Sequence, residues 1–534
     1  MEALQKSIHE CILDRADFFR IDTNRKLDSG SRMALGQFMT PASVAGFMAS
    51  LFGNARDDVV LLDPGAGVGS LTAAFVEEMS GRAIRPRRIR ADAYEIEPLM
   101  LEYLASVLLA CPRVCAGGGI QFAAQAIKDD FIERGVTLVC ESGDLFGSEC
   151  PEYTHCIMNP PYKKIRSDSD YRVWLRQIGV ETSNLYTAFL AIAIKLLATA
   201  GELVAIVPRS FCNGVYFKPF RALLLREMAL KRLHVFDARD QAFKDDDVLQ
   251  ENIIFHAVKG AKQERIVITS SSDPSSECMT RREVDFERVV KPGDPDRFIH
   301  IAVNDFDQMV VDCIGTFTRS LTDLGLDVCT GPVVDFRLRA DLRQQPGKGA
   351  CPVIYPGHFS SNYVKWPKLG GKKPNAIVES EKSRRWLMAN GWYVVTRRFS
   401  AKEERRRIVA AIHDPANVPG DKVGFENHLN VFHRSNGGLD PTVAKGLALY
   451  LNSTLVDLYF RQFSGHTQVN AADLRMIHYP DLDTLARLGK KVDRAFPNQE
   501  EVDGLLDAEI DTMTKKEKKS NPLKVQGRRR TVRP

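Results

Sequence analysis

The chain has 534 residues, of which 44% are hydrophobic and 26% are charged. At roughly 100–200 residues per domain this length predicts two to four domains, and the composition excludes disordered and fibrous classes. The net charge is +5, but nine Lys/Arg and one Glu between Lys515 and Pro534 give that segment a charge of +8. The remaining 514 residues carry −3, so the overall charge says little about a nucleic-acid partner.

The cysteines and the apolar runs indicate in which cellular compartment the protein works. Eleven cysteines without regular spacing indicate reduced thiols. Cys111 and Cys115 have no second Cys/His pair at zinc-site spacing, so we expect no metal. The N-terminus lacks the apolar core of a signal peptide, and the most apolar run, residues 188–198, is short and contains Lys195. We expect a cytoplasmic protein that does not enter a membrane.

The hydrophobic pattern predicts helices first and then an alternation. Residues 1–58 have helical spacing, with a helix start at Thr40-Pro41. The predicted strands are 59–64, 89–97, 154–162, 201–208, 230–238 and 252–259, and the predicted helices between them include 69–80, 98–110 and 184–199. This alternation predicts an α/β fold with a doubly wound, mostly parallel sheet.

The rest of the chain has a different sequence pattern. Residues 261–500 lose the alternation and contain turn-rich segments and three of the four tryptophans. This pattern predicts a second, α+β domain. The last twenty residues are typical of a disordered basic tail.

A glycine-rich turn follows the first predicted strand. The sequence DPGAGVG (63–69) stands between the apolar VVLL and a helix-like segment. Glycines permit a tight turn and the close approach of a ligand, and Glu95, at the end of the next strand, is placed to bind ribose hydroxyls. Asp63 would repel a pyrophosphate but suits a cofactor with an ammonium group. The alternative is a tight turn that binds nothing.

The motif Asn159-Pro160-Pro161-Tyr162 directly follows the predicted strand HCIM. It therefore lies at the carboxyl end of a strand, where open α/β sheets bind ligands. The prolines stiffen the loop and remove donors, so that Asn159 and free carbonyls can accept hydrogen bonds from an amino group. Tyr162 can stack on a planar substrate. The alternative is a simple proline turn.

Five motifs occur in one order: GQFMTP (36–41), DPGAGVG (63–69), YEIEP (94–98), SGDLF (142–146) and NPPY (159–162). Together they resemble the gamma-class N6-adenine DNA methyltransferases of type II restriction–modification systems, with a TaqI-type catalytic domain. The resemblance implies S-adenosylmethionine as the cofactor and a Rossmann-like methyltransferase sheet followed by a C-terminal α+β target-recognition domain.

The change of pattern along the chain predicts the domain boundaries, and the resemblance implies what each part does. Residues 1–58 form a helical region that packs on the cofactor site, and residues 59–262 form the catalytic domain. Residues 263–500 recognise the DNA target, and residues 501–534 comprise the end of a helix and the basic tail.

Site residues follow from the same resemblance. The catalytic residues that take the target adenine are Asn159, Pro160, Pro161 and Tyr162. The cofactor-binding residues are Thr40, Pro41, Asp63, Gly65, Gly67, Glu95, Ile96, Asp144, Leu145 and Asn159. Phe243 falls where the family places a second aromatic side chain against a flipped base.

A basic segment in the second domain predicts the DNA contacts. Thirteen Lys/Arg and four Glu between Tyr363 and Arg407 give a charge of +9, with aromatic residues interleaved. The predicted DNA-binding residues are Tyr162, Phe243, Lys365, Trp366, Arg384, Arg385, Arg397 and Arg398. A solvated charged face is the alternative. The expected partner is double-stranded DNA, with a cognate endonuclease that forms no stable complex with this monomer.

Three other functions share part of this pattern. Methyltransferases that act on a protein glutamine or on RNA adenine also use NPPY, but the glutamine enzymes lack a basic C-terminal domain of this size. A combined restriction–methylation enzyme would need a nuclease cluster, which we do not find. A non-catalytic nucleic-acid binder would not need Asp63, Glu95 and NPPY together.

Overall fold

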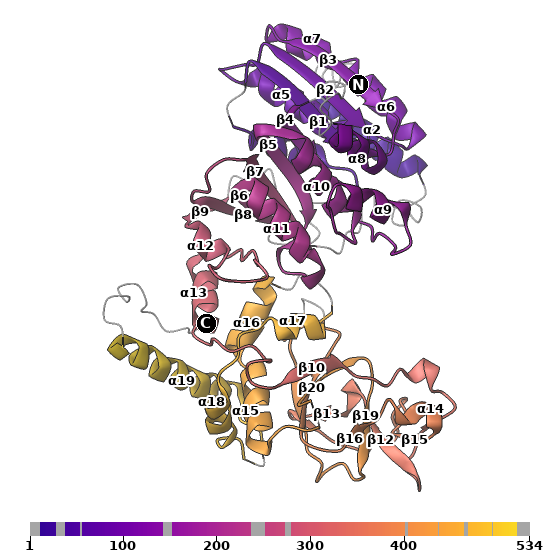
Figure 1. The fold of residues 1–534 in the computed structure, drawn as a ribbon, viewed down its shortest axis with the longest axis vertical. Coiled ribbons are helices and arrows are strands. Elements are labelled where there is room, and N and C mark those ends of the chain that lie inside the picture. Colours follow the sequence, from indigo (N-terminus) through magenta and orange to yellow (C-terminus); the bar gives the residue numbers. More distant parts are fainter. Residues whose placement is uncertain are drawn as a thin grey trace, which may run out of the picture. The chain divides into compact units, whose positions relative to one another are not determined.

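The computed structural model describes residues 11–27, 38–53, 56–141, 152–236, 251–272, 279–400, 404–435, 437–463, 468–493 and 495–520. The chain divides into two compact units, Met1–Val303 and Asn304–Pro534 (Figure 1).

The first unit is built on a nine-stranded sheet with the order β3-β2-β1-β4-β5-β7-β6-β8-β9. Its strands are β1 (Asp58–Pro64), β2 (Arg88–Tyr94), β3 (Gln121–Ile127), β4 (Tyr153–Met158), β5 (Leu197–Pro208), β6 (Met228–Phe236), β7 (Asn252–Lys259), β8 (Ile266–Ser271) and β9 (Thr280–Val284). Strands β3, β2, β1, β4 and β5 are parallel neighbours, whereas β7 is antiparallel to both β5 and β6. The predicted α/β fold with a mostly parallel sheet is confirmed.

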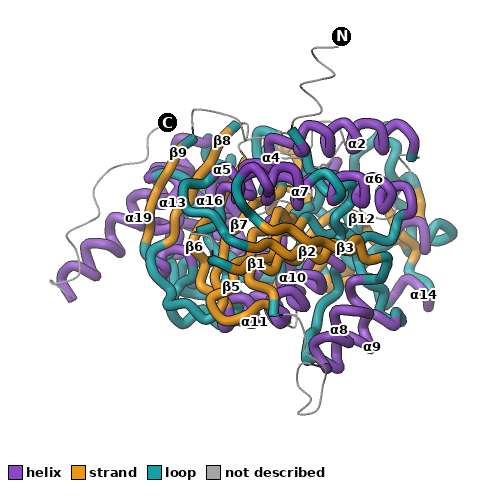
Figure 2. Tube along the Cα trace, turned by 90° about the horizontal axis from the view of Figure 1, so that it is seen from above, coloured by secondary structure: helices purple, strands orange, loops and turns teal. Residues whose placement is uncertain are grey.

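Helices cover both faces of this sheet, as Figure 2 shows. One face carries α2 (Ile12–Lys26), α4 (Ala42–Ser50), α5 (Ser70–Gly81), α6 (Pro98–Leu108) and α7 (Cys111–Gly117). The other carries α8 (Phe131–Glu141), α9 (Asp170–Gln177), α10 (Leu185–Leu196) and α11 (Lys218–Glu227). Short helical turns lie at Arg209–Cys212, Val215–Phe217 and Phe286–Val289. Ten of the twelve residues of α10 are buried, which explains its uniformly apolar sequence.

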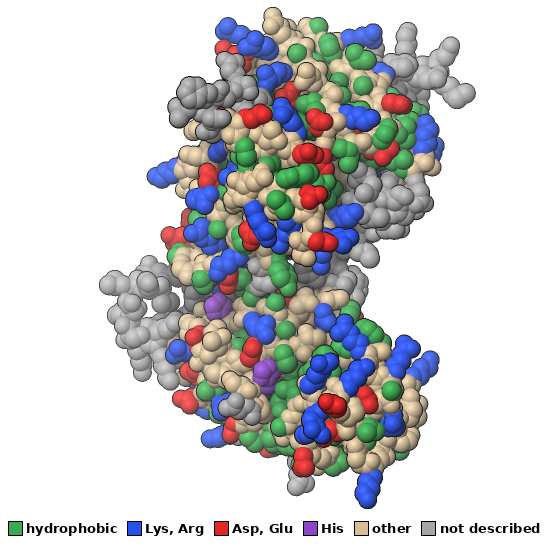
Figure 3. Space-filling model, turned by 45° about the vertical axis from the view of Figure 1, so that its right-hand side comes forward, with side chains coloured by type: hydrophobic (Ala, Val, Ile, Leu, Met, Phe, Trp, Pro, Cys, Tyr) green, Lys and Arg blue, Asp and Glu red, His purple; other side chains and the backbone are tan. Residues whose placement is uncertain are grey.

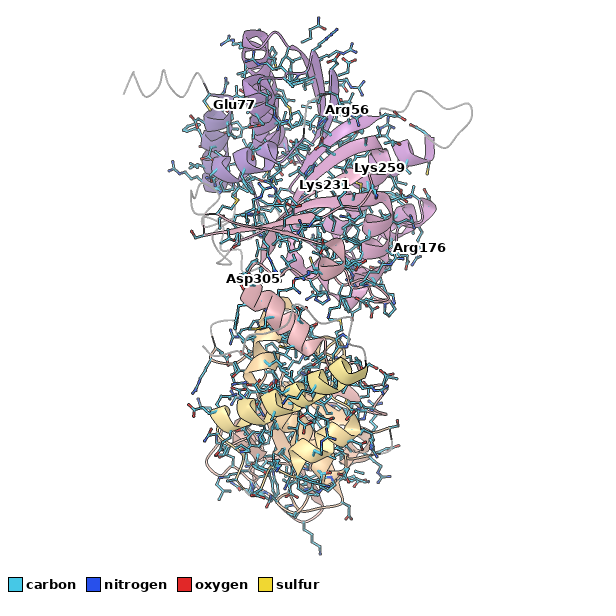
Figure 4. All side chains as sticks on the ribbon, turned by 90° about the vertical axis from the view of Figure 1, so that its left-hand side faces the viewer. Arg56, Glu77, Arg176, Lys231, Lys259 and Asp305 are labelled. Atoms are coloured by element: carbon cyan, nitrogen blue, oxygen red, sulfur yellow. The ribbon has the colours of Figure 1, made fainter. Side chains whose placement is uncertain are left out.

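The N-terminal helices are tied to the sheet unit by two carboxylates. Glu77 of α5, labelled in Figure 4, accepts hydrogen bonds from the backbone N–H of Ile12 at 2.7 Å and of Leu13 at 3.2 Å. These are unpaired donors in the first turn of α2, so Glu77 caps that helix from a neighbouring one. Asp17 in turn accepts from the backbone N–H of Ala42, the first residue of α4, at 3.1 Å. The predicted helix start after Thr40-Pro41 is confirmed.

One apolar run in this layer is long enough to cross a membrane by length and composition. It spans Pro98–Gly117. Within it, Leu104, Val107 and Cys111 are fully buried inside the sheet unit, as expected for helices that pack on a sheet.

The second unit combines two small sheets with a group of helices, which is the predicted α+β arrangement. The six-stranded sheet has the order β10 (Asp327–Thr330), β20 (Leu429–His433), β17 (Tyr393–Arg397), β18 (Ala410–His413), β14 (Tyr363–Val364) and β13 (Phe359–Ser360). The five-stranded sheet has the order β11 (Leu342–Arg343), β15 (Ala376–Val378), β12 (Ala350–Ile354), β19 (Lys422–Phe425) and β16 (Met388–Ala389). The helices are α13 (Asp305–Ile314), α14 (Glu381–Arg384), α15 (Pro441–Leu451), α16 (Thr454–Phe463), α17 (Ala471–Arg475), α18 (Leu482–Gly489) and α19 (Gln499–Ser520), with short turns at Asp335–Arg337 and Pro356–His358.

Two expected boundaries differ from the structure. Strands β8 and β9 continue the first sheet beyond residue 262, so the first unit ends at Val303. The turn-rich sequence around them had suggested a new domain, although β8 still pairs with β6 in parallel. Helix α19 extends to Ser520 and therefore includes the start of the segment expected to be a disordered tail. Residues 521–534 lie outside the described residues.

Helices α15 and α18 approach each other closely at two glycines. A Cβ at Gly446 would lie 1.8 Å from the carbonyl oxygen of Leu485, and a Cβ at Gly489 would lie 1.8 Å from that of Thr442. Such distances are far below van der Waals contact, so each substitution would force the helices apart.

We therefore expect Gly446→Ala to lower the free energy of unfolding by at least ~1–3 kcal/mol, because it overpacks the helix contact. Gly504→Ala is the matched control, since no atom lies within 4 Å of its Cβ position in α19. That change should raise stability by up to ~1 kcal/mol through helix propensity. Chemical denaturation of both variants tests this, and equal effects would contradict the close contact.

Candidate functional site

Three loops meet at one edge of the first sheet because their strands are parallel neighbours. In the β1–β2 pairing, Pro64 lies opposite Tyr94, and the backbone N–H groups of Gly65 and Ala66 donate to the Tyr94 carbonyl at 2.9 and 2.8 Å. Strand β4 lies on the other side of β1 and is followed directly by Asn159. The glycine-rich turn, the Glu95 loop and the NPPY motif are thus brought together, as predicted.

The glycine-rich turn and Glu95 are joined by hydrogen bonds. Gly65 and Gly67 have φ of +76° and +57°, a region that side chains disfavour. The backbone N–H of Gly67 donates to Glu95 Oε2 at 2.9 Å, and those of Ile96 and Glu97 donate to Oε1, each at 2.8 Å. Glu95 is only 5% exposed. Burial raises its pKa, and the three backbone donors oppose that shift.

A cavity of about 330 Å³ opens between these loops. Its apolar walls include Met39, Val68, Met100, Phe131, Ile132 and Phe189. Its polar groups include Thr40, Ser70, Glu95, Asp130 and Asn159, and basic residues Lys163, Lys164 and Arg166 also line it. Mostly apolar walls with a few fixed polar groups are typical of a site for a small organic ligand.

The Asn159 side chain is held in one orientation at the cavity wall. Its Nδ2 donates to the Phe38 carbonyl at 2.6 Å and to Thr40 Oγ1 at 3.0 Å, and its Oδ1 accepts from the Tyr162 hydroxyl at 3.0 Å. The two donors face acceptors, so the amide oxygen and nitrogen cannot exchange places without losing both bonds. The oxygen keeps one lone pair for a further donor.

Tyr162 is packed by other rings. Its hydroxyl also lies 3.2 Å from the Ile206 carbonyl, and its ring centroid lies 5.8 Å from that of Phe38 and 6.2 Å from that of Tyr186. Burial raises the pKa of the Tyr162 hydroxyl well above its ordinary value. The hydroxyl is therefore a neutral donor that helps to fix Asn159.

Several residues predicted to bind the cofactor or the substrate do not line the cavity. Asp63 is fully buried and does not line the cavity: its Oδ2 accepts from Thr72 Oγ1 at 2.7 Å, and its Oδ1 has no hydrogen-bond partner among the described residues. Pro41 is the N-cap of α4, and Pro160 is buried. Asp144, Leu145 and Phe243 lie outside the described residues.

Other site residues were missed from sequence. Phe131 begins the amphipathic helix α8 and Phe189 lies in the mostly apolar α10, so both look like core residues in the sequence. Lys163 and Lys164 look like a solvated pair. The position of Phe38 in the motif GQFMTP indicates that it lies near the site. Its contribution is its backbone carbonyl, which every residue type carries and which the sequence therefore cannot predict.

The basic residues of the second unit are of two kinds. Lys365, Arg384 and Arg385 are exposed, and Lys and Arg side chains gather with a few acidic ones on the face of this unit shown in Figure 3. Trp366 is half-buried and donates to the Asn375 carbonyl at 2.7 Å. Arg398 donates internally to the Asn427 carbonyl at 3.3 Å.

Arg407 is fully buried, with its Nε 3.2 Å from Ser400 Oγ. The +9 charge of the segment therefore overstates its charged surface. Within the described stretches, no group of three or more His, Cys, Asp or Glu could hold a metal ion.

Known proteins resemble this chain over most of its length. A family model described as Eco57I restriction-modification methylase matches residues 125–243. The type II methyltransferase M.BsuBI of Bacillus subtilis is 44% identical over 501 residues, which cover 93% of this chain and 97% of that protein. The type II methyltransferase M.PstI of Providencia stuartii is 43% identical with the same coverage of each chain. The fold of the type IIL restriction-modification enzyme MmeI in complex with DNA matches with a TM-score of 0.52 at 11% identity, covering 96% of this chain and 75% of that one.

The buried Asp63 predicts a pH-dependent stability. Burial raises its pKa from 3.8 to about 7. Between about pH 4 and 7 the unfolded chain has lost this proton while the folded protein keeps it, so unfolding becomes easier as the pH rises. The contribution amounts to ~1.4 kcal/mol per pH unit and levels off above about pH 7.

We expect Asp63→Asn to remove this slope, so that its stability relative to the parent protein increases from pH 5 to pH 7.5. Chemical denaturation at the two pH values measures the difference, and an equal difference at both would contradict a protonated Asp63.

Proposed function

Because the chain belongs to the type II methyltransferases of restriction–modification systems, we propose that it methylates the N6 amino group of an adenine in a specific double-stranded DNA sequence. The methyl donor is S-adenosylmethionine, and the product protects host DNA from a cognate endonuclease. The observation that carries this proposal is the fixed amide of Asn159 at the wall of the cavity.

The cavity suits S-adenosylmethionine. Glu95 is held rigidly by three backbone donors, and the acceptor capacity left on its carboxylate can take a ribose hydroxyl. Ile96, which is exposed and lines the cavity, can lie against the adenine ring. The apolar walls take the rest of the molecule. When bound, this cofactor supplies an electrophilic methyl group on a sulfonium centre.

Asn159 makes the target nitrogen reactive. The N6 amino group is conjugated with its ring, so its lone pair is a poor nucleophile. Hydrogen bonds from N6–H to Asn159 Oδ1 and to the Pro160 carbonyl favour a tetrahedral nitrogen whose lone pair points at the methyl group. With the cofactor bound, Asn159 and the Pro160 carbonyl would hold N6 while the cofactor supplies the methyl group, and the proton that N6 gives up would pass to solvent.

The target adenine has to leave the duplex to reach this pocket. Extrusion costs a few kcal/mol, and stacking on an aromatic ring offsets about 1–3 kcal/mol of it. Tyr162 is half-buried beside Asn159 and supplies that ring. Lys163 and Lys164 follow it directly and are exposed, where they can neutralise phosphates that flank the extruded base.

The alternatives have less support. The two relatives that align over 97% of their own length are both type II methyltransferases, which disfavours a protein or RNA substrate and a fused nuclease.

We expect Asn159→Ala to lower turnover more than tenfold, a barrier increase above ~1.4 kcal/mol, with nearly unchanged cofactor affinity. Glu95→Ala is the reciprocal control and should weaken cofactor binding. Incubation with duplex DNA and methyl-labelled cofactor, followed by nucleoside analysis, measures turnover and identifies the product. Calorimetry measures the affinity for the cofactor. N6-methyladenine is the expected product; a different methylated nucleoside, or transfer only to protein or RNA, would overturn the proposal.

Thr40 should act through Asn159. Thr40→Val removes one of the two acceptors of Asn159 Nδ2, so we expect turnover to fall roughly 2- to 13-fold, the worth of one hydrogen bond. Thr40→Ser keeps the hydroxyl and should restore the rate. Steady-state kinetics separate the roles: a rise in KM for the cofactor with unchanged kcat would instead make Thr40 a cofactor contact only.

A further inference from the structure

A second cavity, of about 490 Å³, lies entirely within the second unit. It opens where β12 and β17 end and where a short turn joins β19 to β20. The side chains that line it are Tyr355, Lys373, Arg397, Phe399, Glu426 and His428.

The backbone around this pocket is held from several sides. The N–H of Glu426 donates to the Ile354 carbonyl at 3.0 Å, and that of Asn427 donates to the Val333 carbonyl at 2.9 Å. The His428 carbonyl accepts from the N–H of Arg398 at 2.9 Å. The turn that presents Glu426 and His428 is therefore a fixed element, in contrast to most loops.

Two buried polar groups of the pocket have no partner among the described residues. The Tyr355 side chain is 2% exposed, yet its hydroxyl makes no hydrogen bond there, and neither does the buried Nε of Arg397. Buried polar groups are normally paired, so both groups are available to a ligand that enters the pocket. The Arg397 guanidinium is instead supported by the ring of Phe359, 5.7 Å away.

The other charged groups of the pocket are already paired. The Glu426 carboxylate accepts from the His428 backbone N–H at 3.0 Å and contacts His428 Nδ1, and Lys373 Nζ lies 2.7 Å from Asp335 Oδ2. The bond to Nδ1 leaves Nε2 of the exposed His428 ring for a ligand. Phe399, 46% exposed, lies at the pocket with its ring centroid 5.0 Å from that of His428.

We propose that this pocket reads a guanine of the target sequence, with Arg397 on its edge and His428 as a second contact. The proposal rests on the proposed DNA methyltransferase function. A guanine presents two acceptors, O6 and N7, side by side in the major groove, and the arginine fork matches them. A phosphate also suits arginine, but its charge would lie beside the fully buried Glu426 carboxylate, whereas a base edge is neutral.

The test compares Arg397→Lys and Arg397→Ala with the parent protein on a library of duplexes with randomised sequence. The methylated adenines and their flanking bases are sequenced, and affinity is measured at several salt concentrations. Discrimination for guanine at one position should fall roughly 5- to 150-fold in both variants, because lysine keeps the charge and lacks the fork. Affinity for non-cognate duplexes and its salt dependence should stay nearly unchanged.

Lys382→Gln is the matched control, since Lys382 is exposed on α14 outside the pocket; the choice of sequence should not change. His428→Ala is a second variant that leaves β17 intact. It should lower discrimination between bases at the same position of the target or at the adjacent one.

Two results would overturn the proposal. Rescue by lysine with a loss of about one unit in the log–log salt slope of the alanine variant would indicate a phosphate contact, and unchanged preference in all three pocket variants would exclude base reading. Failure of the parent protein to methylate any duplex would instead remove the proposed function itself.

Discussion

The parallel register of β2, β1 and β4 is the constraint on which the catalytic site depends. Parallel neighbours end at the same edge, so the residues after Pro64, Tyr94 and Met158 converge although they are spread over about a hundred positions of the chain. The ends of the strands set the positions of the loops, so the loop sequences are not needed to bring the site together. The residues of each loop are therefore free to serve ligand binding.

The site nevertheless is incomplete without a segment from outside the sheet. Phe38 and Thr40 precede β1 in sequence and still supply both acceptors for the Asn159 amide, which follows β4. A carboxamide has nearly symmetric shape but opposite polarity at its two ends, so an unsupported Asn159 could present a donor where the reaction needs an acceptor. Fixing this side chain is therefore a matter of chemistry as well as of packing.

Sequence patterns predicted the sheet and the three loops that meet at the cavity, because strand periodicity and glycine or proline turns are local properties. They predicted only a minority of the residues that line the cavity, among them Gly67, Glu95 and Asn159. Strand β3 was missed because it is an edge strand, QFAAQAI, in which three of the seven residues are alanines of weak strand propensity and none is buried. The burial of Asp63 and the internal roles of Arg398 and Arg407 could not be predicted. The sequence does not show whether a charged side chain faces solvent or bonds inside the fold, as these do with Thr72, Asn427 and Ser400.

The fully enclosed helix α10 has a consequence for how the chain is made. Its surface packs against α8, which precedes it, and against β5 and α11, which follow it by up to about thirty residues. At a synthesis rate of roughly 5–20 residues per second, the side of this helix that α11 covers stays exposed on the nascent chain for about 2–6 seconds. During that interval α10 is exposed to aggregation and to capture by chaperones, so slowed translation across β5 to α11 should lower the yield of native protein.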